Sequence, residues 1–316
     1  MSVRGVAGCI AVALLAGSCS APAAAPSVAR STIRFASGGP NGPFRAPGQA
    51  LVTAYQKQLP EFDARVVLTQ GSLDDVMALQ RGEADVAFSY ADLAYAGFVG
   101  KLRERTPPFE GLRGIALLQR AAVHAVAGPA ASVRHIRDLR GRRADLGGAA
   151  TLAAQSVLTA FQLKPEAIQI APRPADSVAA LLHGDVDTIF LLGVPPIAAA
   201  RTALEGGAHL IPVDGAAVDE LLRRYPFYSA ILLRPQMYGE LPAPVATIGI
   251  NGVLLCRADL DDDVVFRLTK ALYEGPGESS VDPAVVPWLD LSVGAATPVP
   301  LHPGAARYYR ERELTR

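Results

Sequence analysis

The residues best suited to chemistry are a glycine-rich loop and a few polar side chains that follow short extended segments. Ser37-Gly38-Gly39-Pro40-Asn41-Gly42-Pro43-Phe44 precedes a helix-forming stretch. Its glycines would let backbone N–H groups approach an anion closely at the start of that helix, although a tight turn without a ligand also fits the segment. The spacing matches neither a Walker loop nor GxGxxG, so it does not predict nucleotide binding.

Two charged residues are candidates for recognising a ligand. Arg45 follows the glycine-rich loop, and its guanidinium could hold a carboxylate through two parallel hydrogen bonds. The alternative is a helical arginine that points to water. Asp92 stands three residues after Ser89 and could receive a ligand ammonium group, or it could cap a helix that continues through Tyr95.

The histidines and serines form no recognisable catalytic set. There is no HExxH, CxxC or GxSxG sequence, so the chain predicts neither a metal site nor an activated nucleophile, and it is not expected to be an enzyme. The histidines never recur at metal-ligand spacing: His124, His135, His183, His209 and His302.

A pattern that occurs twice indicates which elements position these residues. Gly82 to Phe88 and Gly184 to Phe190 share the form GxxDxxF, and each copy follows a helix-like stretch. Upstream of each lies an extended run that ends in paired glycines, Ile33 to Gly39 and Arg142 to Gly148. The chain is therefore interpreted as two similar α/β lobes. Parallel α/β sheets bind ligands beyond the carboxyl ends of their strands, so two facing lobes would form a clamp.

Hydrophobic periodicity and turn residues predict the individual elements. Ser72 is expected to cap a helix whose first turn holds Asp74 and Asp75, and 225–244 is expected to be irregular. The expected strands are Ile33–Ala36, Ala64–Leu68, Asp85–Phe88, Ile115–Leu118, Val123–Ala127, Ala167–Ile170 and Val245–Cys256. The expected helices are 47–58, 72–81, 151–161, 175–183, 261–274 and 303–314, of which 261–274 should pack on the first lobe.

The overall composition excludes some classes of partner. The 30 basic residues balance 30 acidic ones, and 19% of the residues are charged, so there is no general attraction to nucleic acid or to an anionic membrane. Cys256 is expected to pack in a buried strand, and no structural disulfide is predicted. No stretch after the N-terminal segment is expected to cross a membrane.

Residues 1–29 are typical of an export signal followed by a tether. Arg4 precedes the apolar run Val6 to Gly17, after which Ala, Pro and Ser predominate. Two cleavage schemes fit: a lipoprotein site that would leave Cys19 lipidated, and ordinary signal peptidase sites within 21–25. The expected location is the periplasm, with lipid at Cys19 as the only membrane anchor.

Several motifs, taken together and in order, carry a family resemblance. They are IRFASGG at 33–39, QGS at 70–72, LQRGEADVAFSYADLAY at 79–95, YPFY at 225–228, RADL at 257–260 and PLHPGAARYY at 300–309. In these motifs the chain resembles the TAXI family of TRAP-transporter solute receptors, over nearly all of its length after the signal.

The resemblance implies an α/β, two-lobed type 2 periplasmic binding-protein (Venus-flytrap) fold with a cleft between the lobes. Lobe I would comprise 30–124 and 245–316, and lobe II 125–244. The implied ligand is glutamate, glutamine or a related carboxylate, passed without a cofactor to an integral-membrane TRAP permease. The implied solute-binding residues are Gly39, Asn41, Gly42, Phe44, Ser72, Ser89, Tyr90 and Asp92 of lobe I, and Ala149, Thr151, Phe190, Leu192 and Gly193 of lobe II, beside the candidate Arg45.

The chain departs from the family's pattern near the expected ligand. Phe44-Arg45 stands where the family usually has two aromatic residues, and the loop 147–151 is shorter than usual. The segment 233–238 replaces a turn with more glycine. A rival interpretation is a sensory or interaction protein that keeps the clamp fold and signals to a membrane partner.

Overall fold

The structure is a computed structural model, and it describes residues 31–39, 42–172, 174–239, 241–274, 289 and 292–314. The predicted signal and tether, Cys19 and the candidate Asn41 lie outside these residues. In chain order the elements are β1 (Ser31–Ala36), α1 (Arg45–Gln58), β2 (Phe62–Val67), α2 (Ser72–Gln80), β3 (Val86–Tyr90), α3 (Ala91–Phe98), β4 (Leu112–Ala127), η1 (Ile136–Leu139), β5 (Arg143–Asp145), α4 (Thr151–Ala160), η2 (Pro165–Ala167), β6 (Gln169–Ile170), α5 (Ser177–His183), β7 (Thr188–Gly193), α6 (Ala198–Glu205), β8 (His209–Ile211), α7 (Ala216–Arg224), β9 (Tyr228–Leu233), α8 (Pro235–Tyr238), β10 (Val245–Arg257), α9 (Asp262–Tyr273) and α10 (Pro303–Leu314).

The strands alternate with helices, and this alternation produces parallel pairing within each half of the structure. The first half is built on β1–β3 and the second half on β5–β7. β1 pairs in parallel with β2 and β3, and β5 pairs in parallel with β6 and β7. Through the described residues the strand order is β2-β1-β3-β10-β4-β7-β5-β6, with β8 on β4 and β9 on β10. The predicted parallel α/β organisation is therefore confirmed.

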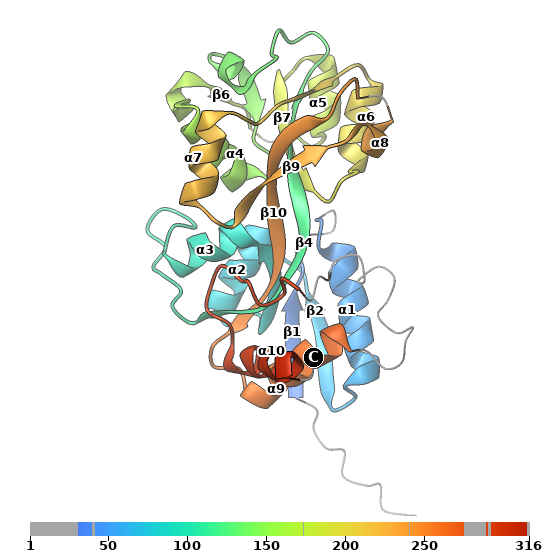
Figure 1. Ribbon diagram of the computed structural model, residues 1–316, viewed down its shortest axis with the longest axis vertical. Helices are drawn as coiled ribbons and strands as arrows, with labels where there is room; N and C mark the ends of the chain where they lie inside the picture. Colours follow the sequence, from blue (N-terminus) through green and yellow to red (C-terminus); the bar gives the residue numbers. More distant parts are fainter. Residues whose placement is uncertain are drawn as a thin grey trace, which may run out of the picture. The chain divides into compact units, whose positions relative to one another are not determined.

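Two long antiparallel strands join the halves (Figure 1). β10 pairs with β9 through Val245–Ile250 and with β3 through Gly252–Cys256. β4 pairs with β10 over 112–122 and with β7 over 122–127. Each long strand therefore belongs to both halves, and the chain passes between them in two places.

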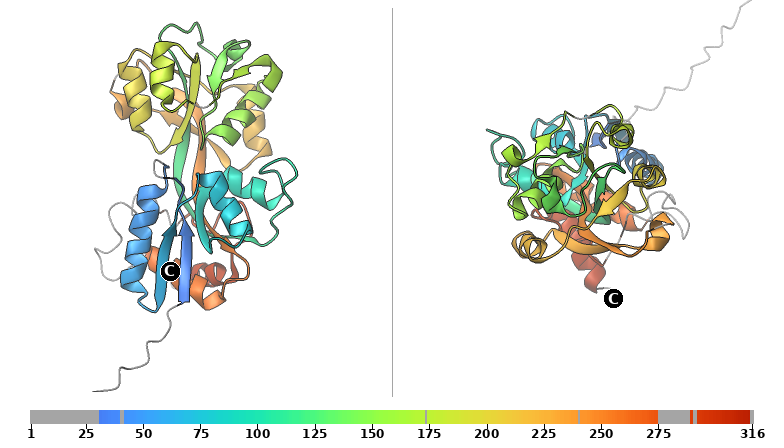
Figure 2. Two further views of the ribbon diagram at one scale, coloured as in Figure 1. Left: turned by 180° about the vertical axis from the view of Figure 1, so that it is seen from behind. Right: turned by 90° about the horizontal axis from the view of Figure 1, so that it is seen from above.

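Helices cover both sides of each half. α1 lies on one side of β1–β3, while α2 and α3 lie on the other (Figures 1 and 2). In the second half α4 and α7 pack together, and α5 packs with α6. One buried apolar cluster includes residues of both halves, such as Phe35, Leu118 and Val157, and smaller clusters lie under α2 and α5.

The helix predicted to pack on the first half does so. α9 buries Val265, Leu268 and Leu272 and contacts α1. The hydroxyl of Tyr55 in α1 donates to the Leu268 carbonyl oxygen at 2.9 Å. The last two helices therefore close the core of the half in which the chain begins.

Three local expectations were wrong. The segment 225–244 is not irregular, because β9 pairs with β10 and a short helix, α8, follows Pro235. Ile115–Leu118 and Val123–Ala127 belong to one strand, β4, whose polar interruption at Gln119-Arg120 marks the junction between halves and not a turn. Ser72 is the first helical residue, Gly71 precedes it as N-cap, and no side chain caps this helix.

Candidate functional site

The glycine-rich loop connects the end of β1 to the start of α1. Gly42 N–H donates to the Gly39 carbonyl oxygen at 2.9 Å, and Arg45 N–H donates to the Gly42 carbonyl oxygen at 3.1 Å. Gly38 has φ +78°, a conformation that an L side chain rarely adopts. Seen from behind, β1 points toward the start of α1 at the junction of the halves (Figure 2).

Three helices of the first half begin beyond neighbouring parallel strands. α1, α2 and α3 follow β1, β2 and β3, which lie side by side in the order β2-β1-β3. Their N-cap residues are Phe44, Gly71 and Tyr90, and none of these makes a side-chain capping bond. The free N–H groups and positive dipole ends of such helices suit an anion.

The hydroxyls predicted to bind solute differ in their surroundings. Ser89 is fully buried, and its hydroxyl donates to the Ser72 carbonyl oxygen at 3.0 Å, so it connects β3 to α2. The Ser72 hydroxyl has no hydrogen-bond partner within the described part of the chain. Of the two, Ser72 is the better placed to bind a ligand.

Phe44 and Tyr90 pack against each other beneath the loop. Their ring centroids lie 4.8 Å apart, and Phe44 also stacks on Phe88 at 5.7 Å. Both predicted residues are almost completely buried, with exposures of 1%. They support the start of α1 from below.

Arg45 enters the first turn of α1 half-buried. Its Nη1 atom is buried and has no hydrogen-bond partner among the described residues. A buried guanidinium N–H without a partner is costly, so this group is poised for an acceptor.

Both oxygens of the Asp92 carboxylate accept hydrogen bonds from the protein itself. It is 2% exposed; one carboxylate oxygen accepts from Leu93 N–H at 2.8 Å, and the other accepts from the Tyr228 hydroxyl at 3.4 Å. The Tyr228 hydroxyl also lies 3.2 Å from Ser156 Oγ in α4. Burial raises the pKa of Asp92 to about 6. Asp92 therefore connects α3 to elements of the second half.

Asp75 is a site residue that the sequence analysis missed. It is fully buried, and its Oδ1 accepts from Gly38 N–H at 3.0 Å and from the Thr69 hydroxyl at 2.6 Å. Its Oδ2 is buried without a hydrogen-bond partner in the described chain. Burial raises the pKa of Asp75 to about 7 despite these two bonds. Asp75 holds the glycine-rich loop against α2.

The loop of the second half is built differently. Asp145 accepts from Gly147 N–H at 2.9 Å and from the Ser177 hydroxyl at 2.5 Å. The Thr151 hydroxyl donates to the Gly147 carbonyl oxygen, which occupies it within the loop. Ala149, the other predicted residue here, is half-buried before the start of α4.

The predicted residues of β7 mainly pack. Phe190 is fully buried opposite Ala125, and Leu192, opposite Val123, is half-buried. Gly193 is buried and ends the strand. α3 and α4 are in contact, so the structure brings Tyr90 and Asp92 near α4. No hydrogen bond among the described residues joins the glycine-rich loop to 149–151.

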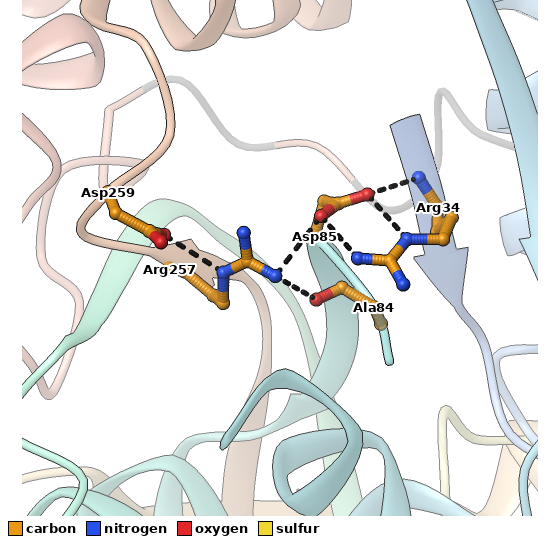
Figure 3. Close-up of polar contacts among 5 residues, drawn as sticks. All are labelled: Arg34, Ala84, Asp85, Arg257 and Asp259. Carbon is orange, nitrogen blue, oxygen red and sulfur yellow. Dashed lines mark hydrogen bonds and ion pairs between the residues drawn. The ribbon is translucent and has the colours of Figure 1, made fainter. Parts of the chain in front are cut away.

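The aspartate of the repeated GxxDxxF pattern pairs with an arginine in the same way in both halves, and we call this pairing the aspartate–arginine clamp. Asp85 accepts from Arg34 backbone N–H and Nε, each at 2.9 Å, and from Arg34 Nη2 at 2.8 Å (Figure 3). Asp187 accepts from Arg143 N–H, Nε and Nη2 at 2.8, 3.3 and 2.9 Å. Each aspartate precedes its strand, so the clamps lie at the strand ends opposite the candidate ligand loops.

Neither a metal centre nor a membrane span emerges from the described ranges. They contain no group of three or more His, Cys, Asp or Glu side chains that could hold a metal ion. Likewise, none of the helices described has the length and apolar character needed to traverse a bilayer.

Solved structures share this fold at low sequence identity. MatC from Rhodopseudomonas palustris, solved with bound malate, has a TM-score of 0.55 and 14% identity, covering 89% of this chain and 97% of that one. A protein from Bordetella bronchiseptica RB50 has a TM-score of 0.54 and 16% identity, covering 90% and 98%. A TctC solute-binding protein from Polaromonas, solved without ligand, has a TM-score of 0.50 and 18% identity, covering 91% and 99%.

These likenesses identify the two-lobed Venus-flytrap fold of periplasmic binding proteins, as predicted. The match to a family extends over most of the chain, from residue 35 to residue 312. The chain belongs to the NMT1-like family.

Proposed function

We propose that the protein is a periplasmic receptor that captures a small organic anion, a glutamate-like amino acid or a dicarboxylate, and delivers it to a TRAP-type permease. The observation that carries the proposal is the set of three helix starts, α1, α2 and α3, which lie beyond adjacent parallel strands without side-chain caps. A carboxylate there would accept backbone N–H bonds and gain about 0.3–1 kcal/mol from each helix dipole.

The relatives support the same class of ligand. MatC holds malate, and the Polaromonas relative is a solute-binding protein. The TRAP permease is proposed from the resemblance of motifs such as 79–95 to the TAXI receptors. We further propose that residues 1–29 export the chain, with Cys19 as the lipid anchor if the lipoprotein site is used, and that 125–244 forms the second lobe.

Each candidate residue has a proposed role. Backbone N–H groups at the start of α1, next to Gly39 and Gly42, hold one carboxylate together with the Ser72 hydroxyl. Arg45 holds a second negative charge through its unpartnered guanidinium. Thr151 and the end of β7 close over the ligand from the other half. Asp92 accepts a hydrogen bond from the Tyr228 hydroxyl and thereby positions the two halves relative to each other.

A ligand screen tests the proposal directly. The purified protein is unfolded and refolded to remove bound solute, and its melting temperature is measured with amino acids, dicarboxylates and keto acids. A ligand at about 100 times its Kd should add about 2.7 kcal/mol to the free energy of unfolding. No shift with any of these compounds, in a correctly refolded sample, would contradict a receptor for small organic anions.

Arg45→Ala tests whether Arg45 binds a second carboxylate of the ligand. A dicarboxylate should bind about tenfold more weakly to the variant, whereas a monocarboxylate should change little. Arg65→Ala is the matched control, because the exposed Arg65 on β2 pairs with Asp63 at 2.6 Å. Equal losses for both ligand types in Arg45→Ala would remove Arg45 from the proposed site.

Delivery to the permease is tested separately. Cells that express the receptor together with a TRAP permease should take up the labelled ligand found in the screen. Uptake without dependence on the receptor would contradict the transport role while leaving solute binding intact.

A further inference from the structure

A pocket lies on the face of the long strands away from the glycine-rich loop. A Cβ on Gly252 would lie within about 3.3 Å of the Phe44 ring and of Leu118 Cβ, so this face of β10 meets the loop side. Leu117 precedes Leu118, and Asn251 precedes Gly252. Leu117 and Asn251 both line the pocket, as expected because successive residues of a strand point to opposite faces. The pocket has a volume of about 580 Å³, within the range of small-molecule sites.

Aromatic rings form one wall of this pocket. Tyr95 and Phe227 have centroids 5.2 Å apart, and Phe227 and Tyr225 have centroids 5.5 Å apart. All three rings line the pocket, and all three are half-buried, so each keeps some accessible surface. Tyr95 comes from α3, whereas Tyr225 and Phe227 come from the connection between α7 and β9, so the wall unites segments from both halves.

Two arginines line the same pocket, whose lining includes no acidic residue. Arg120 and Arg224 are exposed lining residues, and no Asp or Glu belongs to the lining. Neither guanidinium has an ion pair among the described residues, although Arg224 lies 5.5 Å from the centre of the Tyr225 ring. The Arg120 stem packs across β10, since a Cβ on Gly249 would meet Arg120 Cδ at 2.6 Å.

We propose that this pocket binds a small organic anion with a flat apolar body, such as an aromatic carboxylate. The rings supply the stacking surface, and the two guanidinium groups supply donors in the planar geometry that a carboxylate accepts. The pocket reaches Ala91, the first residue of α3, but no residue of the glycine-rich loop, α1 or α2 lines it, so this binding does not depend on the solute proposed at that loop.

Binding of three probes to the full chain, measured by titration calorimetry, tests the proposal. Benzoate carries both the ring and the charge, benzyl alcohol only the ring, and acetate only the charge. Saturable binding of benzoate, with at least tenfold weaker binding of the other two, is the expected result. No saturable binding of benzoate, or equal binding of acetate, would overturn the proposal.

Variants then locate the bound benzoate. Arg224→Gln and Arg120→Gln should each weaken benzoate binding about tenfold. Arg223→Gln is the matched control, because Arg223 is an exposed neighbour that pairs with Glu220 and does not line the pocket. An equal loss in the control would indicate nonspecific charge attraction, and a loss confined to Arg45→Ala would place benzoate at the glycine-rich loop. Either outcome would contradict this pocket as the site.

Discussion

In both aspartate–arginine clamps the carboxylate accepts from the backbone N–H, Nε and Nη2 of one arginine. The two clamps differ in whether the carboxylate has a further partner. In the second half the Asp187 carboxylate binds only Arg143 among the described residues, and it joins β5 to β7. In the first half Asp85 binds Arg34 and also lies 3.3 Å from Arg257 Nη1, so β1, β3 and the end of β10 meet at one carboxylate (Figure 3). Arg257 also donates to the Ala84 carbonyl oxygen and to Asp259.

This difference follows from the path of the chain. The strand β10 leads back to the half in which the chain began. Its last residue, Arg257, contacts Asp85 and so fixes the end of β10 beside β3. Burial alone would raise the pKa of Asp85, but the hydrogen bonds and charges of Arg34, with the charge of Arg257, outweigh it and leave the pKa lowered. The same balance, with Arg142 as a weaker charge, lowers the pKa of Asp187. The repeated aspartate is therefore a device for strand pairing, and it is not a ligand group.

Removing each aspartate tests this comparison and should give the largest effect. Asp85→Ala leaves the Arg34 guanidinium without its carboxylate and takes one of two carboxylates from Arg257, so the free energy of unfolding should fall by about 3 kcal/mol. Asp187→Ala leaves one more exposed arginine and should cost about 2 kcal/mol. Urea denaturation measures both. If Asp187→Ala cost as much as Asp85→Ala, Arg257 would have no role in the clamp.

The paired-glycine loops offer a second comparison. Gly147 has φ +65°, and a Cβ there would lie 2.2 Å from the Phe190 carbonyl oxygen. At Gly38, with φ +78°, the nearest atom to such a Cβ would be Asp75 Oδ2 at 3.7 Å. Gly147→Ala should therefore cost about 2.5 kcal/mol, from strain and overlap, and Gly38→Ala about 1 kcal/mol, from strain alone.

Thermal unfolding of the two glycine variants checks this order. The reverse order would show that the loop of the second half moves away from β7 without difficulty. Circular dichroism of both variants before heating serves as the control for correct folding.

Local patterns predicted elements well where periodicity and turn residues agreed. The helix 303–314 matches α10, and 245–256 lies within β10. No prediction covered α6 and α7, although Val218 and Leu221, three residues apart, are the buried residues of α7. β9 was missed because prolines at 226 and 235 flank a short strand whose pairing with β10 is not visible in its own residues.

Contacts between distant residues could not be predicted from local sequence. Asp74 and Asp75 are neighbours in one helical turn, yet Asp74 pairs with Arg81 near the surface and Asp75 is buried under the glycine-rich loop. Only the approach of that loop, far away in the chain, distinguishes them. Arg257 and Asp85 are likewise brought together by the return of β10. The site residues gathered around α1–α3 thus remain a prediction that ligand binding must test.

The loop carboxylates supply the third comparison, because Asp145 accepts on both oxygens while Asp75 leaves Oδ2 without a partner. The pKa of Asp75 rises from about 3.9 in an unfolded chain to about 7 in the folded protein. Between these values the folded state keeps a proton that the unfolded state has lost, so this group's stabilisation, complete below about pH 4, declines as the pH rises and is lost above about pH 7. Asp75→Asn should remove this decline, making the variant gain about 2 kcal/mol relative to the wild type between about pH 5.5 and pH 8. Thr69→Val should shift the decline to higher pH, because the Thr69 hydroxyl lowers the pKa of Asp75. Urea denaturation across this pH range measures both effects, and parallel pH profiles for Asp75→Asn and the wild type would mean that Asp75 stays ionised beneath the loop.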